Sequence, residues 1–151
     1  MKQTDAWNAA KSRIENQIKG LRHRLHACPE RSGQERKTKA ALKQFLEENT
    51  SLELYDCGEG FYAAYRSDVP DSAKKGIAFR ADYDALALPE GGAAHLCGHD
   101  GHVSALCGAA LLLEQQVKAG RDPGRNVFFL FQPAEETGAG ASPCCELFDK
   151  E

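Results

Sequence analysis

Two short apolar runs on either side of a helical pattern constrain the fold of this chain more than any other feature. The first run, GIAFRAD, covers residues 76–82, and the second, VFFLFQP, covers 127–133. Each has the length and composition of a buried strand. The pattern between them predicts a helix from about 101 to 117, because apolar residues recur there at three- and four-residue spacings. These residues are Val103, Leu106, Ala110 and Leu113. We therefore expect a strand, a helix and a second strand.

The residues before 76 add helices and a hairpin. A stripe of apolar residues predicts a helix from about 5 to 26, which ends before Pro29. The stripe includes Ile14, Ile18, Leu21 and Leu25. Ser32 and Glu35 have the spacing of a capping box, which predicts the start of a second helix that runs to about 48.

The stretches LELYDC and GFYAAYR, at 52–57 and 60–66, are short, apolar and aromatic, and glycines separate them. This pattern is typical of a hairpin. Together with the later strands and helices, it predicts an α/β fold: a layered sheet with flanking helices.

Polar motifs follow both predicted strands. RADYDAL follows the first strand, QPAEETG follows the second, and HLCGHD opens the helix between them. In open α/β sheets, ligands bind beyond the carboxyl ends of the strands. We therefore expect the three loops to converge on one site.

These motifs contain the side chains that a metal site needs. Cys97 and His99 lie two residues apart, so a sulfur and an imidazole nitrogen can face one ion from an extended loop. Glu135 and Glu136 are adjacent, so in an extended segment their side chains point in different directions, and one can bind metal while the other reaches the substrate. In the alternative interpretation, Cys97 is a core thiol, the histidines cap the loop and the glutamates are surface charges.

Composition limits the other classes of function. The chain has 151 residues, enough for roughly one domain, and a formal net charge of −3. That charge does not favour nucleic acid or a membrane surface as a partner. The N-terminus lacks an apolar signal-peptide core, and no apolar run is long enough to span a bilayer. We expect a cytoplasmic location.

The cysteines favour reduced thiols. Cys107 lies in an apolar helical pattern and is predicted to be a small core residue. The others outside the metal motif, Cys28, Cys57, Cys144 and Cys145, have no ligand spacing. A thiol-redox function that uses Cys97 or the Cys144–Cys145 pair is disfavoured, because there is no C-x-x-C motif and a disulfide between neighbouring residues is strained.

Four ordered motifs resemble those of metal-dependent N-acyl-amino-acid amidohydrolases, a carboxypeptidase-like family. The motifs are LRHRLHACPERSGQERKT, FRADYDAL, HLCGHDGH and FQPAEETGAGA, and they extend from Leu21 to Ala141. The family includes hippurate, aminobenzoyl-glutamate and indoleacetyl-amino-acid hydrolases. The resemblance implies hydrolysis of the amide bond of N-acyl-amino acids or short peptides by a metal-activated water.

The resemblance also implies roles for individual residues. Cys97, His99 and Glu136 would be metal ligands, and Glu135 the general base. Asp82 and Asp100 would orient imidazoles around the site. His95 and His102 are expected to make local hydrogen bonds rather than to bind metal. The complete site would hold two divalent ions, zinc or manganese, with cobalt or nickel also compatible.

Departures from the family pattern suggest a fragment. Relatives are more than twice as long and take two further histidine ligands from beyond the glutamate pair, where this chain has no histidine. We expect residues 1–151 to be a partial catalytic domain, truncated before the dimerisation domain and the remaining ligands, and inactive alone. Full-length relatives are expected to be homo-oligomers. The alternative is a non-catalytic binding or regulatory module that retains the fold.

Overall fold

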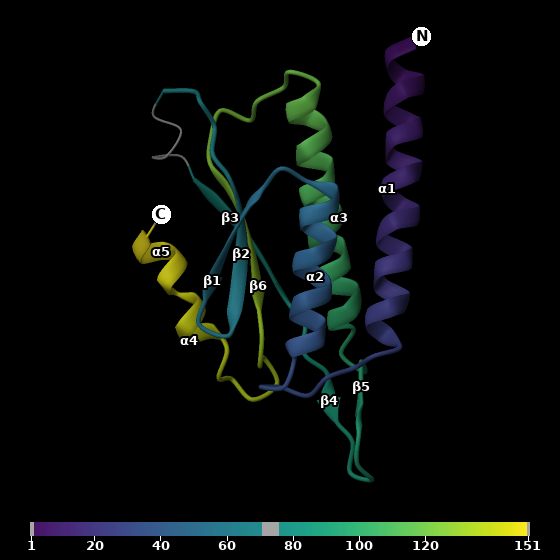
Figure 1. The fold of residues 1–151 in the computed structure, drawn as a ribbon, viewed down its shortest axis with the longest axis vertical. Helices are drawn as coiled ribbons and strands as arrows, with labels where there is room; N and C mark the ends of the chain where they lie inside the picture. The colour runs from purple at the N-terminus through teal and green to yellow at the C-terminus, as the bar shows by residue number, and fades with distance from the viewer. Residues whose placement is uncertain (1, 71–75, 151) are drawn as a thin grey trace.

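A four-stranded sheet lies between two layers of helices in the computed structural model, which describes residues 2–70 and 76–150 (Figure 1). Helices α2 (Arg36–Asn49) and α3 (His99–Lys118) lie on one side of the sheet, and α1 (Lys2–His26) packs on α3 farther from the sheet. The short helices α4 (Ala141–Cys144) and α5 (Glu146–Lys150) lie on the other side. The predicted α/β class, a layered sheet with flanking helices, is confirmed.

The strands are arranged in the order β1-β2-β6-β3. Their bounds are Glu53–Cys57 for β1, Gly60–Tyr65 for β2, Ile77–Asp82 for β3 and Val127–Gln132 for β6. The hairpin of β1 and β2 is antiparallel as predicted, and β2 is antiparallel to β6. Strands β3 and β6 are parallel, with Asp82 opposite Gln132. Because parallel strands end at the same edge, the two motifs that follow β3 and β6 begin side by side.

The main core lies between the sheet and helices α1, α2 and α3. The stripe on α1 is buried at Ile14, Leu21 and Leu25, as its spacing predicts. Phe61 of β2 and Phe131 of β6 stack with ring centroids 4.4 Å apart, and neither is exposed. A separate short pair of strands, β4 (Leu86–Ala87) and β5 (Ala93–Ala94), extends from the end of the sheet where the motifs lie (Figure 1).

Strand β3 is less buried than its apolar sequence predicts. It is the last strand of the described sheet, and Ile77 and Phe79 are 36% and 46% exposed. Their neighbours on β6, Val127 and Phe129, are buried. A run of apolar residues indicates a strand but does not reveal whether helices cover its whole length.

The predicted capping box does not form. Helix α2 begins at Arg36 after Glu35, and no side chain caps it through the predicted pair. Instead, Glu30 accepts hydrogen bonds from the backbone N–H groups of Lys37 and Thr38. Ser32 and Glu35 bond to the loops of the polar motifs, so tertiary contacts override the local pattern.

Among the described helices, none combines the length and apolar character needed to cross a membrane.

Candidate metal centre

The three motif loops converge on His99, the first residue of α3. Gly98 precedes it with a left-handed backbone (φ 81°), which glycine adopts without strain and which turns the chain into the helix. The His99 ring is buried, and its Nδ1 lies 3.0 Å from Oδ1 of Asp84 in the loop after β3. With Nδ1 as the donor, Nε2 is left to face the other loops. The predicted convergence of the loops is confirmed.

Asp84 is the centre of this arrangement, although sequence reasoning gave it no role. It is fully buried, and its Oδ2 accepts hydrogen bonds from Ser32 Oγ at 2.6 Å and from the Glu136 N–H at 3.0 Å. Asp84 thus links the chain before α2, His99 and the glutamate loop. Its position two residues after Asp82 in RADYDAL was the available signal, because alternate residues of an extended segment point to the same side.

One group of side chains could hold a metal ion: Cys97, His99 and Glu136 offer ligand atoms within 4.8 Å of one another. A hydrogen bond with Glu136 raises the pKa of the Cys97 thiol to about 11. The Oε1 atom of Glu136 is buried without a hydrogen-bond partner among the described residues. Buried carboxylate oxygens are rarely left unpaired. Thiolate, imidazole and carboxylate are ligands that zinc accepts, so these residues fit such an ion.

The glutamate loop differs from the extended segment that was predicted. Residues 135–138 form a turn, in which the Gly138 N–H bonds to the Glu135 carbonyl at 2.8 Å. Glu135 Oε2 and Glu136 Oε1 therefore both approach Nε2 of His99, at 3.9 and 3.7 Å. Ala134 just before the turn has a positive φ of 48°, an uncommon conformation for a residue with a side chain. The prediction that the two carboxylates point in different directions because the segment is extended was wrong.

A second group that could hold a metal ion consists of Asp82, His99 and His102. Asp82 accepts a hydrogen bond from Nδ1 of His102 at 3.0 Å and lies 3.8 Å from Nε2 of His99. Arg80 bonds to both Asp82 and Gln132 at 2.9 Å, which joins the ends of β3 and β6. Burial raises the pKa of Asp82, but the bond from His102 and the nearby positive charges outweigh it, and the net pKa is lowered.

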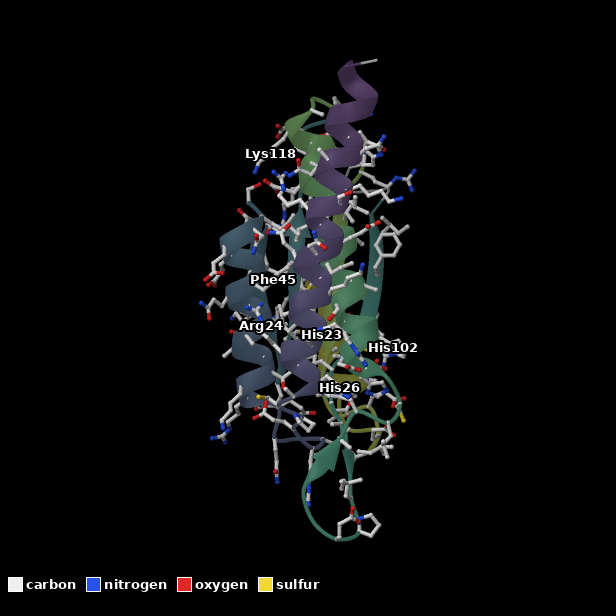
Figure 2. All side chains as sticks on the ribbon, turned by 90° about the vertical axis from the view of Figure 1, so that its right-hand side faces the viewer. His23, Arg24, His26, Phe45, His102 and Lys118 are labelled. Carbon is white, nitrogen blue, oxygen red and sulfur yellow. The ribbon has the colours of Figure 1, made fainter. Side chains whose placement is uncertain are left out.

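Asp100 contacts a different imidazole from the one at the centre. Its Oδ2 lies 2.8 Å from Nδ1 of His26 and 2.9 Å from Nε of Arg22, both on α1. Figure 2 shows His26 at the end of α1 beside the start of α3, where His102 lies. His95 stacks on His26 with ring centroids 6.2 Å apart, and neither His95 nitrogen has a hydrogen-bond partner among the described residues. Burial lowers the pKa of His95.

Comparisons with known proteins identify similar proteins. The model of peptidase family M20/M25/M40 matches residues 78–151. The chain is 38% identical over 146 residues to an N-acetyl-L-cysteine deacetylase of Bacillus subtilis, a match that covers 89% of this chain and 34% of the relative. The chain thus spans about a third of the length of this curated relative.

Solved structures show the same fold. The YXEP protein of Bacillus subtilis, described as a dinuclear metal-binding peptidase from the M20 family, matches with a TM-score of 0.73 at 35% identity. That match covers 94% of this chain and 40% of the other. An aminobenzoyl-glutamate utilization protein from Klebsiella pneumoniae matches with a TM-score of 0.74 at 20% identity, over 94% of this chain and 42% of the other, which shows a shared fold. The chain is therefore similar to proteins of peptidase family M20/M25/M40, and its fold matches an N-terminal portion of their catalytic domain.

Proposed function

We propose that this chain is the metal-binding part of a hydrolase that cleaves the amide bond of N-acyl-amino acids. The observation that carries the proposal is the convergence of Cys97, His99 and Glu136, with the buried Oε1 of Glu136 unpaired among the described residues. The similarity to an N-acetyl-L-cysteine deacetylase supports the substrate class.

In this proposal Cys97, His99 and Glu136 hold a divalent ion, of which the complete site contains two. The similarity to a dinuclear metal-binding peptidase supports the number of ions. Zinc suits the mixed sulfur, nitrogen and oxygen set, and manganese, cobalt or nickel are compatible with it. Asp84 orients His99 through Nδ1, and Asp82 and Asp100 fix the neighbouring rings of His102 and His26.

The chemistry divides between the ion and Glu135. A bound divalent ion would lower the pKa of a water molecule and polarise the amide carbonyl. Glu135 is 42% exposed at its side chain, so it can meet a substrate, and its Oε2 lies 3.9 Å from Nε2 of His99. Glu135 would take the proton of the attacking water as general base and then deliver it to the leaving amine.

The remaining metal ligands would come from outside these residues. By family resemblance, two histidines beyond the glutamate pair complete the site, and this chain has no histidine after His102. We therefore propose that residues 1–151 form a partial catalytic domain that has little or no activity alone. We also propose that the full-length protein is cytoplasmic and forms homo-oligomers.

Hydrolysis assays on two lengths of the protein test this function. The 151-residue chain and a version extended through the downstream histidines would be given zinc or manganese and N-acyl-amino acids, including N-acetylcysteine and hippurate. We expect the extended protein to release free amino acid and the 151-residue chain to show no more than trace release. Absence of hydrolysis by the extended, metal-loaded protein would contradict the function and favour a non-catalytic module. Robust turnover by the short chain would contradict the incomplete site.

A further inference from the structure

Two buried cysteines contact each other on the sheet face opposite α1, α2 and α3. Cys57 ends β1, and Cys144 lies in α4, which packs beside the β1–β2 hairpin (Figure 1). They belong to a small apolar cluster separate from the main core and are 1% and 2% exposed. Neither is a member of the groups that could hold a metal ion.

The local geometry brings the two sulfur atoms together. The thiols share a hydrogen bond, and Cys144 Sγ also lies 3.9 Å from the Cys57 carbonyl oxygen. Gly60, the partner of Cys57 in the antiparallel register, leaves room for this contact. A Cβ on Gly60 would lie 2.8 Å from Cys144 Sγ, closer than real Cβ atoms approach other groups. The cysteines are 87 residues apart, which is why their spacing gave no signal in the sequence.

We propose that Cys57 and Cys144 are a reversible oxidation site that forms an intramolecular disulfide with a small disulfide oxidant such as oxidised glutathione. The Cys144 thiolate attacks one sulfur of the oxidant, which forms a mixed disulfide and releases one thiolate. The Cys57 sulfur, after losing its proton, then attacks the Cys144 sulfur and releases the second thiolate. The two cysteines lose two electrons and two protons, and the oxidant becomes two thiols.

The hydrogen bond between the thiols favours this order of attack. Donation from Cys57 lowers the pKa of Cys144, and the same bond raises the pKa of Cys57. The thiolate is the reactive form of cysteine, and Cys144 lies on the four-residue helix α4 whereas Cys57 is held in strand β1, so Cys144 is the first nucleophile. Cys145 and Cys28 are exposed, so the oxidant can reach each of them as a single thiol.

Access to the buried pair requires local opening of the last helices. Helix α4 has four residues and α5 has five, so they can separate from the sheet at a lower free energy than the central strands. We therefore expect oxidation of the pair to be slower than modification of the exposed cysteines. In a reducing compartment the pair stays as thiols, and it changes state only when the thiol pool is oxidised.

The disulfide would also restrain the glutamate loop. Helix α4 begins at Ala141, just after Gly140, whose N–H bonds to the carbonyl of Ala134 at 3.2 Å. A covalent bond from Cys144 to the end of β1 therefore tethers the C-terminal end of the segment that contains Glu135 and Glu136. Because the bond closes a long loop, we expect the midpoint of thermal unfolding to rise on the order of 10 °C.

Peptide mapping of the Cys145→Ser variant tests the proposal. Trypsin places Cys57 in the peptide 44–66 and Cys144 in the peptide 126–150, and the substitution removes the other cysteine of the second peptide. The full 151-residue chain is incubated with reduced or oxidised glutathione, its free thiols are blocked, and the digest is analysed by mass spectrometry. We expect the two peptides to be joined only after oxidation and to separate again with reductant.

Other variants provide the controls. Cys57→Ala and Cys144→Ala should each abolish the link, and the map of the Cys145→Ser chain stands even if these buried substitutions impair folding. Cys107 is buried without a neighbouring cysteine contact among the described residues and should remain a thiol. The proposal is overturned if peptides 44–66 and 126–150 stay unlinked, or if a link seen in the unsubstituted chain is lost in Cys145→Ser.

Discussion

Asp84 fixes the orientation of His99: its Oδ1 lies 3.0 Å from Nδ1 of the ring and leaves Nε2 directed at Cys97 and Glu136. Both residues are buried, so water does not compete for this hydrogen bond. The same carboxylate holds the backbone of Glu136. One buried aspartate therefore sets the position of candidate ligand residues on two different loops.

Replacement of this aspartate should weaken metal binding. Asp84→Asn retains the shape but removes the charge that favours His99 with its proton on Nδ1. Loss of a group that orients a ligand typically costs 10–100-fold in metal affinity, and we expect a loss of about that size. Zinc titration in competition with a chelator measures it. Asp56→Asn, on the exposed end of β1, serves as control and should bind zinc as the unsubstituted chain does. If the zinc affinity of Asp84→Asn is unchanged, Asp84 does not orient the metal-binding side chains.

Substitutions of the two neighbouring glutamates should have different effects, one on the hydrolysis rate and the other on metal binding. In the extended protein, Glu135→Gln cannot accept the proton of water, so the rate should fall by about 10²–10⁴-fold with little loss of metal. Glu136→Gln should lose metal affinity first. Bound metal and hydrolysis rate are measured for both variants. Both carboxylates lie within 4 Å of His99 Nε2, so either can reach an ion bound there. If Glu135→Gln loses the metal and Glu136→Gln retains it, the two roles are reversed.

Glu114 should make stability depend on pH. Burial raises the pKa of this carboxyl, but bonds from the Ser51 N–H and hydroxyl and from Lys118 outweigh burial, and the net pKa lies below its ordinary value of 4.5. The unfolded chain then binds the proton more tightly than the folded chain. The resulting stability is therefore present above pH 4.5 and is lost as the pH falls through the folded pKa.

We expect Glu114→Gln to lower the free energy of unfolding by about 1–2 kcal/mol at neutral pH and by less in acid. Urea unfolding at about pH 7 and about pH 3.5, on either side of the ordinary glutamate pKa, measures the difference. The exposed Glu47→Gln on α2 is the matched control and should change neither value. An equal loss at both pH values would show that the charge of Glu114 is not responsible.

The stacked phenylalanines of the main core should dominate its stability. Phe131 is completely buried against Phe61, and Phe131→Ala should cost about 3–5 kcal/mol in the free energy of unfolding. Phe148 on α5 is 67% exposed, so Phe148→Ala should change that free energy by less than about 0.5 kcal/mol. Chemical denaturation of both variants provides the comparison. Similar losses of unfolding free energy in the two variants would contradict the position of the main core in the structure.

Patterns within single elements predicted much of this fold. The stripe through Ile14 and Leu25 predicted α1, and the two apolar runs predicted β3 and β6. Contacts between residues far apart in the chain were not predicted. Ser32 and Glu35 have capping-box spacing, yet they bond to Asp84 and to the Ala134 N–H, partners 52 and 99 residues away.

The candidate site, like the fold, was predicted only in part. The positions of Cys97, His99 and Glu136 at loops beyond strand ends predicted that their side chains meet. Asp84 was missed because nothing in its own loop shows that His99 and Glu136 would share it. The direction of Glu135 was missed because the chain forms a turn after Ala134, which has a positive φ that its sequence does not favour.

X-ray absorption at the zinc edge tests the central claim, that Cys97, His99 and Glu136 together hold a divalent ion. The zinc-loaded chain should give one sulfur at about 2.3 Å and nitrogen or oxygen at about 2.0–2.2 Å. Cys97→Ser should lose the sulfur contribution and bind zinc more weakly, whereas Cys28→Ser, at another exposed cysteine, should retain both. A zinc shell without sulfur in the unsubstituted chain, or an unchanged shell in Cys97→Ser, would contradict the account.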